Sequence, residues 1–432
     1  MIDGLKSAYR KEYERNPVLT LFLTILIVFF IIFVIAAILT NGNTVKLMFV
    51  YDPNDTFMDY FNSIMYSSDR PYTYWLVVYP PLITVMYAVI GRFMIPFVDV
   101  LPGEKLSFAL RYTQMGMMSF FLISILTFFL LHWIFRKIVK NADWRTELLF
   151  LLMMLSFPFM YALERGNSII LTLVFCFMFL LGYKSENKFI RYASYVALGC
   201  AAGFKLYPAI LFLLILRERR YKEAGICVAI VATLLLMPFI FTDGTPLIYL
   251  DTLFTYSGTF VGVTNINQIV TEILQFLLGV SEKVTSIVSN AILGIFTVLS
   301  LIVILFDKEM KFWKVLALIG CNLILGFGVG CQYQLVYMAM PILYFLAAEK
   351  EMTKENKTYA ICFAMMMVLI PGVMIEGDFF TGLITGGIHP SWIIGAFETA
   401  LVIVVAIMLL REGIGRLYRK RREVRSHRGD PA

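Results

Sequence analysis

Three carboxylates lie close together early in the chain. Residues 51–64 read Tyr-Asp-Pro-Asn-Asp-Thr-Phe-Met-Asp-Tyr-Phe-Asn-Ser-Ile and hold Asp52, Asp55 and Asp59. Asp59 is flanked by apolar and aromatic residues, so we expect it to be partly buried, and a carboxylate in a partly dry cleft can accept a proton from a hydroxyl group. Asp52 and Asp55 also fit ordinary turn and helix-cap positions. A solvated loop acid is the alternative for Asp59.

Two basic residues are isolated between short apolar runs. Arg165 lies in Glu164-Arg-Gly-Asn167, and Lys205 lies in Gly203-Phe-Lys-Leu-Tyr-Pro208. A cation in or beside a membrane needs an anionic partner, because its desolvation is costly. A lipid phosphate would serve either residue. Glu164 is the alternative partner for Arg165, and for Lys205 the alternatives are a carboxylate of the early acidic segment or a side chain that extends to the lipid headgroups.

Amides and one histidine complete the candidate residues. Asn267 and Gln268 lie in a long outer loop before an amphipathic stretch, Gln332 lies at another outer turn, and His389 lies in Gly-Gly-Ile-His-Pro-Ser-Trp. Amide side chains suit hydroxyl-rich ligands, but they also cap helices. For His389, the alternative to ligand binding is a structural role. The chain has no Ser/His/Asp set, phosphate-binding glycine loop or Cys/His metal spacing.

The composition indicates which elements position these residues. Apolar residues make up 59% of the 432, charged residues 16%, and the mean hydropathy is +0.78. Soluble domains carry about 25% charged residues. Apolar runs recur along the whole chain, and in lipid each must satisfy its own backbone as a helix. The sequence therefore predicts an all-α, polytopic transmembrane protein with about twelve spans, in one integral membrane domain.

The charges predict the orientation. The net charge of +7 comes from short basic clusters between apolar runs, as in cytoplasmic loops, which argues against a nucleic-acid partner. The first run, residues 17–40, follows a basic N-terminus and should deliver the acidic residues 41–75 to the outside. Both termini should be cytoplasmic, so the number of crossings should be even. Thirteen apolar runs are present, and we expect residues 77–97, interrupted by Tyr79-Pro80-Pro81, to enter the membrane without crossing.

The ordered motifs resemble a known family. The chain is similar to the GT-C glycosyltransferases and, more narrowly, to glycosyltransferase family 87, which includes polyprenol-phosphate-mannose-dependent mannosyltransferases. Asp59 followed by Tyr79-Pro80-Pro81-Leu82 fits the family's first loop, and Gly166-Asn167 fits its Gly-Gln-x-Asn turn without the Gln. Lys205-Leu-Tyr-Pro208 fits its Lys-x-x-Pro element, and Asn267-Gln268 fits its Asn-Gln-Ser element without the Ser.

The resemblance covers residues 17–345 and implies an activity. Residues 17–345 would form the catalytic module, residues 346–411 a C-terminal helical hairpin, and residues 412–432 a basic cytoplasmic tail. A hexose, mannose-like, would pass from a polyprenyl-phosphate sugar donor to a lipid or glycan acceptor on the outer face, with inversion. Asp59 would be the general base, and Lys205 and Arg165 would stabilise the leaving phosphate.

The resemblance also implies a wider set of contacts and a location. The residues expected to bind the donor or acceptor are Asp55, Tyr79, Pro80, Arg165, Asn167, Lys205, Asn267, Gln268, Gln332 and His389. No metal ligand is assigned, although some GT-C enzymes use a divalent metal such as Mg or Mn, which the acidic group could hold. Membrane lipids would surround the protein in a bacterial cell membrane, with the active site outside.

Two other classes of function stay open. A transporter or flippase of lipid-linked sugars would need the same outer polar cleft, and it would also need polar residues in the middle of its spans. Charged residues are nearly absent from the centres of the apolar runs, which favours an enzyme. A non-catalytic subunit of an envelope assembly is the third reading.

Overall fold

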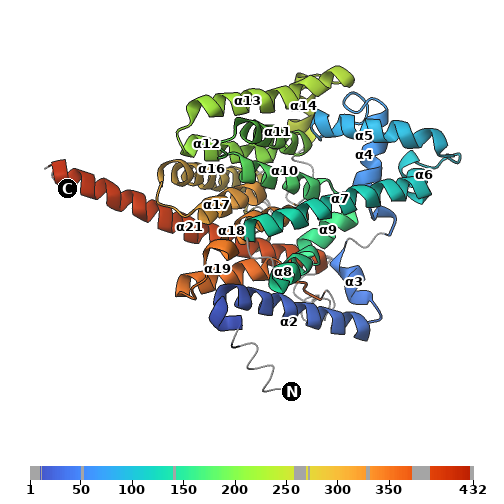
Figure 1. The fold of residues 1–432 in the computed structure, drawn as a ribbon. Coiled ribbons are helices and arrows are strands. Elements are labelled where there is room, and N and C mark those ends of the chain that lie inside the picture. Colours follow the sequence, from blue (N-terminus) through green and yellow to red (C-terminus); the bar gives the residue numbers. More distant parts are fainter. Residues whose placement is uncertain are drawn as a thin grey trace. The chain divides into compact units, whose positions relative to one another are not determined.

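The structure, a computed structural model, describes residues 10, 12–49, 53–139, 143–256, 269–270, 273–326, 331–371 and 390–428. Within these ranges all regular secondary structure is helical (Figure 1). The all-α prediction is therefore confirmed for this part of the chain. The chain forms two compact units: unit 1 comprises Met1–Met48, Ile138–Phe157 and Gly262–Ala432, and unit 2 comprises Phe49–Lys137 and Pro158–Val261.

Unit 2 contains most of the acidic and basic residues singled out above. Its α-helices are α4 (Met58–Ser68), α5 (Pro81–Met94), α6 (Leu106–Tyr112), α7 (Gln114–Val139), α9 (Phe157–Arg165), α10 (Ile169–Gly182), α11 (Lys188–Phe204), α12 (Leu213–Arg217), α13 (Tyr221–Leu236) and α14 (Pro246–Tyr256). Short 3-10 helices lie at Pro53–Asp55, Ile95–Phe97, Tyr207–Phe212 and Met237–Phe241. Apolar residues of α4, α5, α6 and α7, together with Phe204, form one core cluster. This cluster holds α4, which carries Asp59, against α5.

Unit 1 is built around one enclosed helix. Its α-helices are α2 (Pro17–Leu39), α3 (Asn43–Met48), α8 (Trp144–Met154), α16 (Glu282–Phe306), α17 (Phe312–Leu325), α18 (Ala339–Ala348), α19 (Lys354–Met365) and α21 (Pro390–Arg428). It also has a 3-10 helix, Gln332–Met338, and a short π-helix, Ile273–Leu277. Every residue from Trp313 to Leu325 of α17 is buried, because α16, α18 and α21 all pack against this helix.

Local sequence explains where several helices begin. Asn16 precedes α2, and its side-chain oxygen accepts a hydrogen bond from the N–H of Leu19 at 3.1 Å. Asp143 caps α8 in the same way through the N–H groups of Arg145 and Thr146. A capping oxygen satisfies a backbone donor that has no partner within the helix. Pro81 opens α5, where proline is favoured because the missing N–H costs nothing.

Five helical segments of the described chain are long and apolar enough to cross a membrane: Pro17–Leu39, Gln114–Val139, Tyr221–Phe241, Glu282–Phe306 and Ile393–Glu423. A sixth span is added if α8 and α9, which meet at a bend of 52°, count as one. The predicted twelve crossings are not confirmed. Several apolar runs form shorter helices, among them Pro81–Phe97, the run that we expect to enter the membrane without crossing. The apolar run 147–163 is bent where Pro158, which lacks an N–H, falls in the first turn of α9.

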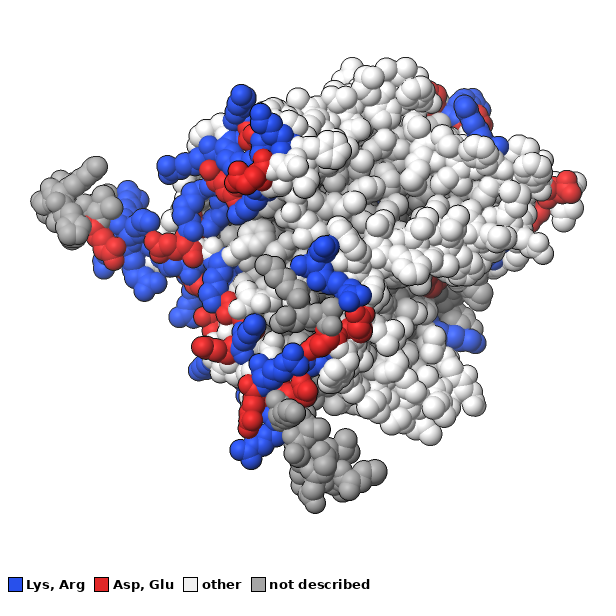
Figure 2. Space-filling view, viewed as in Figure 1, with Lys and Arg blue, Asp and Glu red and all other residues white. Residues whose placement is uncertain are grey.

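The surface fits a protein embedded in lipid. Large apolar side chains such as Ile31, Phe129 and Ile287 are exposed on the long helices, and exposed apolar surface of this kind needs a lipid or protein neighbour. Figure 2 shows Lys, Arg, Asp and Glu gathered in patches, with broad areas of surface that carry none of them. The protein is therefore an integral membrane protein.

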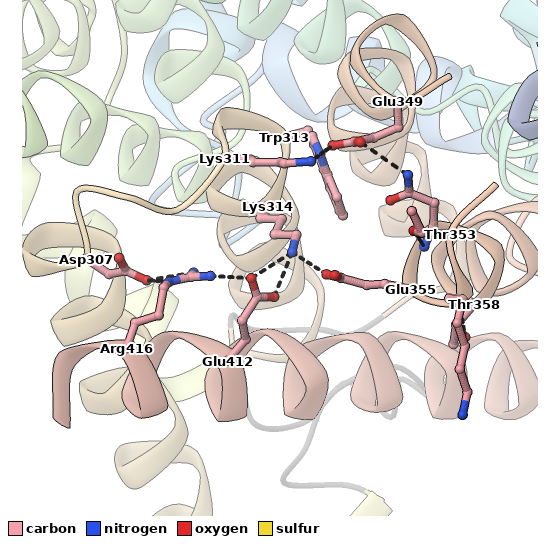
Figure 3. A network of polar contacts seen from close by, with 12 residues as sticks. Asp307, Lys311, Trp313, Lys314, Glu349, Thr353, Glu355, Thr358, Glu412 and Arg416 are labelled. Atoms are coloured by element: carbon pink, nitrogen blue, oxygen red, sulfur yellow. Dashed lines mark hydrogen bonds and ion pairs between the residues drawn. The ribbon is translucent and has the colours of Figure 1, made fainter. Parts of the chain in front are cut away.

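One polar network holds the helix ends of unit 1 together (Figure 3). The ammonium group of Lys314, on α17, forms ion pairs with Glu355 of α19 and with Glu412 of α21. Arg416, one turn after Glu412, binds Asp307 at 2.7 Å. A second group joins Lys311 to Glu349 at 2.5 Å, and the indole N–H of Trp313 donates to the same carboxylate at 2.8 Å. The network ties α17, α19 and α21 together.

Candidate active site

Asp59 lies at the centre of a charged cluster in unit 2. It is the second residue of α4, and its side chain is 18% exposed. One carboxylate oxygen accepts a hydrogen bond from the Arg165 guanidinium at 2.6 Å, and the other accepts one from the Asn167 amide at 2.7 Å. The same guanidinium also pairs with Asp55. Donors on both oxygens fix the orientation of the carboxylate and leave further lone pairs for a ligand.

The turn that carries Arg165 and Asn167 requires a glycine. Gly166 ends α9 with φ +67°, a conformation that favours glycine. A Cβ atom at Gly166 would come within 2.8 Å of the carbonyl oxygen of Phe57. The N–H of Phe57 in turn donates to the carbonyl of Glu164 at 2.7 Å. The turn after α9 is therefore locked to the residue just before α4, which brings Arg165 and Asn167 to Asp59.

The acidic segment is supported from a second side by α6. Arg111 donates to the carbonyl oxygens of Asn54 and Thr56, at 2.7 and 3.2 Å. The hydroxyl of Thr56 donates to Glu164 at 3.2 Å. These contacts hold the short helix that contains Asp55, so the positions of Asp55 and Asp59 do not depend on Arg165 alone.

Lys205 lies at the end of α11, against the start of α5. It is buried, with 7% of the residue exposed, and its ammonium nitrogen lies 4.4 Å from the centre of the Tyr79 ring. An ammonium over an aromatic face is stabilised by the ring's quadrupole. Gly203 makes this approach possible, because a Cβ there would come within 2.7 Å of the Leu82 side chain. The Tyr79-Pro80-Pro81 segment and Lys205 are therefore neighbours, as the order of the motifs suggests.

A clamp formed by Tyr72 and Asp243 fixes the segment before Tyr79. The buried Tyr72 donates its hydroxyl hydrogen to the Tyr79 carbonyl at 2.9 Å. Asp243 accepts from the N–H groups of Tyr72 and Thr73, at 3.1 and 2.9 Å, and from the Thr73 hydroxyl. Burial acts to raise the pKa of Asp243, but these donors outweigh it, so the pKa lies below its ordinary value.

A small, partly open apolar cavity of about 50 Å³ adjoins the cluster. Its walls come from α4, α5, α7, α9 and α10 and include Phe120, Ile123, Phe128 and Leu171. Asn167, which also binds Asp59, is part of the lining. The cavity therefore offers an apolar wall with one polar group, Asn167, on the side of Asp59.

The other predicted site residues divide into two groups. Gln332 belongs to unit 1, where it is buried and its side chain lies against Gly395 of α21. Asn267, Gln268 and His389, and also Asp52, lie outside the described residues. The structure thus brings together Asp55, Asp59, Arg165 and Asn167 as one cluster and Tyr79, Pro80 and Lys205 at the start of α5.

Sequence reasoning missed three contributors. The acidic segment is positioned by Arg111, and Tyr79 by Tyr72 and Asp243. No local sequence motif marks these three residues. Arg165 was expected to pair with Glu164 or a lipid phosphate, whereas its two ion pairs here are with Asp55 and Asp59. The described part of the chain contains no group of three or more His, Cys, Asp or Glu side chains placed to hold a metal ion. In this structure Asp55 and Asp59 are both paired with the Arg165 guanidinium.

Comparison with known proteins identifies one family. The family model of glycosyltransferase family 87 matches residues 77–325, more than half of the chain. The match includes α9, the turn with Arg165 and Asn167, and Lys205. No curated protein and no solved structure matches the chain significantly.

Proposed function

The chain belongs to glycosyltransferase family 87, and we propose that it transfers a hexose, mannose-like, from a polyprenyl-phosphate donor to a hydroxyl of a lipid or glycan acceptor. The observation that carries the proposal is the Asp59 carboxylate, which is partly buried and held through both of its oxygens beside an apolar cavity. The apolar lining of this cavity would suit a contact with the first carbons of the isoprenoid chain of such a donor. The site would face the outside of a bacterial cell membrane.

The proposed step is an inverting displacement. The acceptor oxygen forms a bond to the anomeric carbon, and the bond from that carbon to the phosphate oxygen breaks with its electrons on the phosphate. Asp59 takes the proton of the acceptor hydroxyl. Lys205 is the candidate for stabilising the phosphate charge that develops. Arg165 already pairs with both carboxylates, so we assign it mainly the positioning of Asp59.

The test is sugar transfer by the purified protein in lipid nanodiscs. Labelled polyprenyl-phosphate hexoses are offered as donors with membrane lipid and glycan acceptors, and wild type is compared with Asp59→Asn. General-base catalysis is worth about 100-fold or more, so kcat/KM should fall by at least about that factor. Asp99→Asn, at an exposed carboxylate elsewhere in unit 2, should leave transfer unchanged.

Two outcomes would count against the proposal. Equal transfer by a folded Asp59→Asn variant would remove the base assignment. If wild type formed no product but moved lipid-linked sugar across vesicle membranes, and Asp59→Asn did the same, the transporter reading would replace the enzyme.

A further inference from the structure

Three aromatic rings form a surface group close to the Asp59 cluster. Tyr74 and Trp75 are 57% and 38% exposed. The Trp75 ring lies 4.8 Å from the Tyr66 ring and 4.9 Å from the Tyr74 ring, measured between centroids. We call Tyr66, Tyr74 and Trp75 the aromatic platform. Exposed aromatic rings held side by side offer a large contact area with little loss of side-chain entropy on binding.

The platform stands on a fixed segment of chain. The N–H groups of Tyr74 and Trp75 both donate to the Arg70 carbonyl, at 3.1 and 3.3 Å. In the same segment, Tyr72 is fully buried, and its backbone N–H donates a hydrogen bond to Asp243. A Cβ at Gly244 would come within 2.5 Å of the Tyr72 ring, so the two segments are in close contact. The rings are therefore presented in one orientation before any ligand arrives.

One face of α4 connects the platform to the candidate base. Tyr66 follows Asp59 by seven residues, which is close to two helical turns, so both lie on the same face. The rise of the helix separates them by about 10 Å along its axis. Burial, followed by the negative charges of Asp59 and Asp55, raises the pKa of Tyr66, as expected for a phenol on the same face as these carboxylates.

The neighbours of the platform are polar as well as aromatic. Asp69 and Arg70 form an exposed ion pair at 3.3 Å, and the Arg70 guanidinium lies 5.0 Å from the centre of the Tyr74 ring. A pyranose ring has an apolar C–H face and a rim of hydroxyls. Its C–H groups suit the negative face of an aromatic ring, and its hydroxyls suit carboxylate and guanidinium groups. A lipid headgroup layer would also accept Tyr and Trp. Contact with headgroups would not require three rings packed together, with one of them on the same face of α4 as Asp59.

From this arrangement we propose that the aromatic platform binds a sugar ring of the acceptor, at least one residue away from the ring whose hydroxyl reaches Asp59. The inference rests on the proposed function and narrows its acceptor to a glycan, free or lipid-linked, with two or more sugars. The separation of the platform from Asp59 along α4 makes this prediction specific: the length of the acceptor, and not only its terminal sugar, should matter.

The test compares octyl glycosides with one, two and three hexose units as acceptors. Trp75→Leu and Tyr74→Leu remove a ring face and keep an apolar side chain. For the two- and three-unit acceptors, KM should rise about tenfold in each variant, the size expected for a lost aromatic contact, with kcat unchanged. The one-unit acceptor should be used equally well by variant and wild type. Trp133→Leu, at an exposed tryptophan of α7, is the matched control.

Two results would overturn the platform. The first is a KM for the longer acceptors that does not change in Trp75→Leu and Tyr74→Leu. The second is an equal rise in KM for acceptors of all three lengths, which would assign the rings to the membrane interface. Binding of a free hexose trisaccharide, measured by saturation-transfer NMR on wild type, Trp75→Leu and Asp59→Asn, separates this idea from the enzyme proposal. If Trp75→Leu loses trisaccharide binding and Asp59→Asn retains it, the platform is supported even when no transfer is detected. If the protein transfers sugar but wild type does not bind the trisaccharide, the platform is refuted and the enzyme proposal is not.

Discussion

At the scale of single residues, the site depends on side chains that hold the side chain or the backbone of other residues in place. Asp59 is oriented by Arg165 and Asn167, and these are brought to it by a glycine that lets their turn touch Phe57. Tyr79 is oriented by Tyr72, and Tyr72 by Asp243. A catalytic carboxylate needs this kind of support, because small displacements of a reacting group cost large factors in rate.

Asp243 should make the clamp sensitive to acid. Its pKa is lowered in the folded protein, so its contribution to stability is complete above the ordinary value of about 3.9 and is lost as the pH falls through the lower folded value. Asp243→Asn should therefore lower Tm at pH 7 by about 2–4 °C, the shift that about 1 kcal/mol produces in a domain of this size.

The measurement is thermal unfolding in detergent at a series of pH values. The difference in Tm between wild type and Asp243→Asn should shrink as the pH is lowered below about 4. Asp99→Asn, whose carboxylate is exposed, should match wild type throughout. A difference that stayed constant from pH 7 to pH 3 would show that the clamp does not depend on the ionised carboxylate.

Single residues also show how far sequence could lead. The apolar neighbours of Asp59, the isolated basic residue Arg165 and the motif around Asn167 pointed to three members of the cluster, and the fourth, Asp55, was among the residues that the family resemblance implied. Nothing local could indicate that Asp243 binds Tyr72, because the two are 171 positions apart and each looks like an ordinary loop residue. The two ion pairs of Arg165 were missed because proximity in sequence favoured Glu164.

At the scale of helices, a network of charged groups connects α17, α19 and α21 of unit 1. Lys314 is buried on α17 and is paired with carboxylates from α19 and α21. Removing this buried cation leaves Glu412 with Arg416 as its remaining partner and deprives Glu355 of its ion pair with α17, and hydrogen bonds to charged groups contribute more than neutral ones.

Lys314→Met should therefore lower the free energy of unfolding by about 1–3 kcal/mol. The matched control is Lys420→Met, which removes the exposed pair with Glu309 and should change stability by less than about 1 kcal/mol. Thermal unfolding of both variants in detergent is the measurement. Equal stability of Lys314→Met and wild type would mean that α17 is held by apolar packing alone.

Apolar runs predicted helices reliably but not their lengths. The segments 147–163 and 77–97 are mostly apolar, yet each yields short helices because a proline interrupts the hydrogen-bond ladder or begins a new helix. Hydropathy counts apolar residues without registering such breaks. For this reason the helical class was predictable, whereas the number of full crossings stays a prediction.

At the scale of the whole molecule, the positions of the basic clusters predict how the protein is oriented in the membrane. The basic clusters predict that residues 41–75 lie outside and that both termini lie in the cytoplasm. In a variant without native cysteines, Asp69→Cys should react with a membrane-impermeant maleimide in intact cells. Lys420→Cys should react only after the membrane is permeabilised. The reverse pattern would place the Asp59 cluster on the cytoplasmic side and contradict the proposed location of the acceptor.

The division of the chain between the two units has a consequence for synthesis. Unit 2 is complete once residue 261 has been made, whereas unit 1 combines the first 48 residues, residues 138–157 and everything from Gly262 onward. Its central helix α17 packs against α21, which follows it by more than 60 residues in the chain. The nascent protein can therefore assemble the Asp59 cluster before α17 is made, and α17 lacks one of its covering helices until α21 has been synthesised.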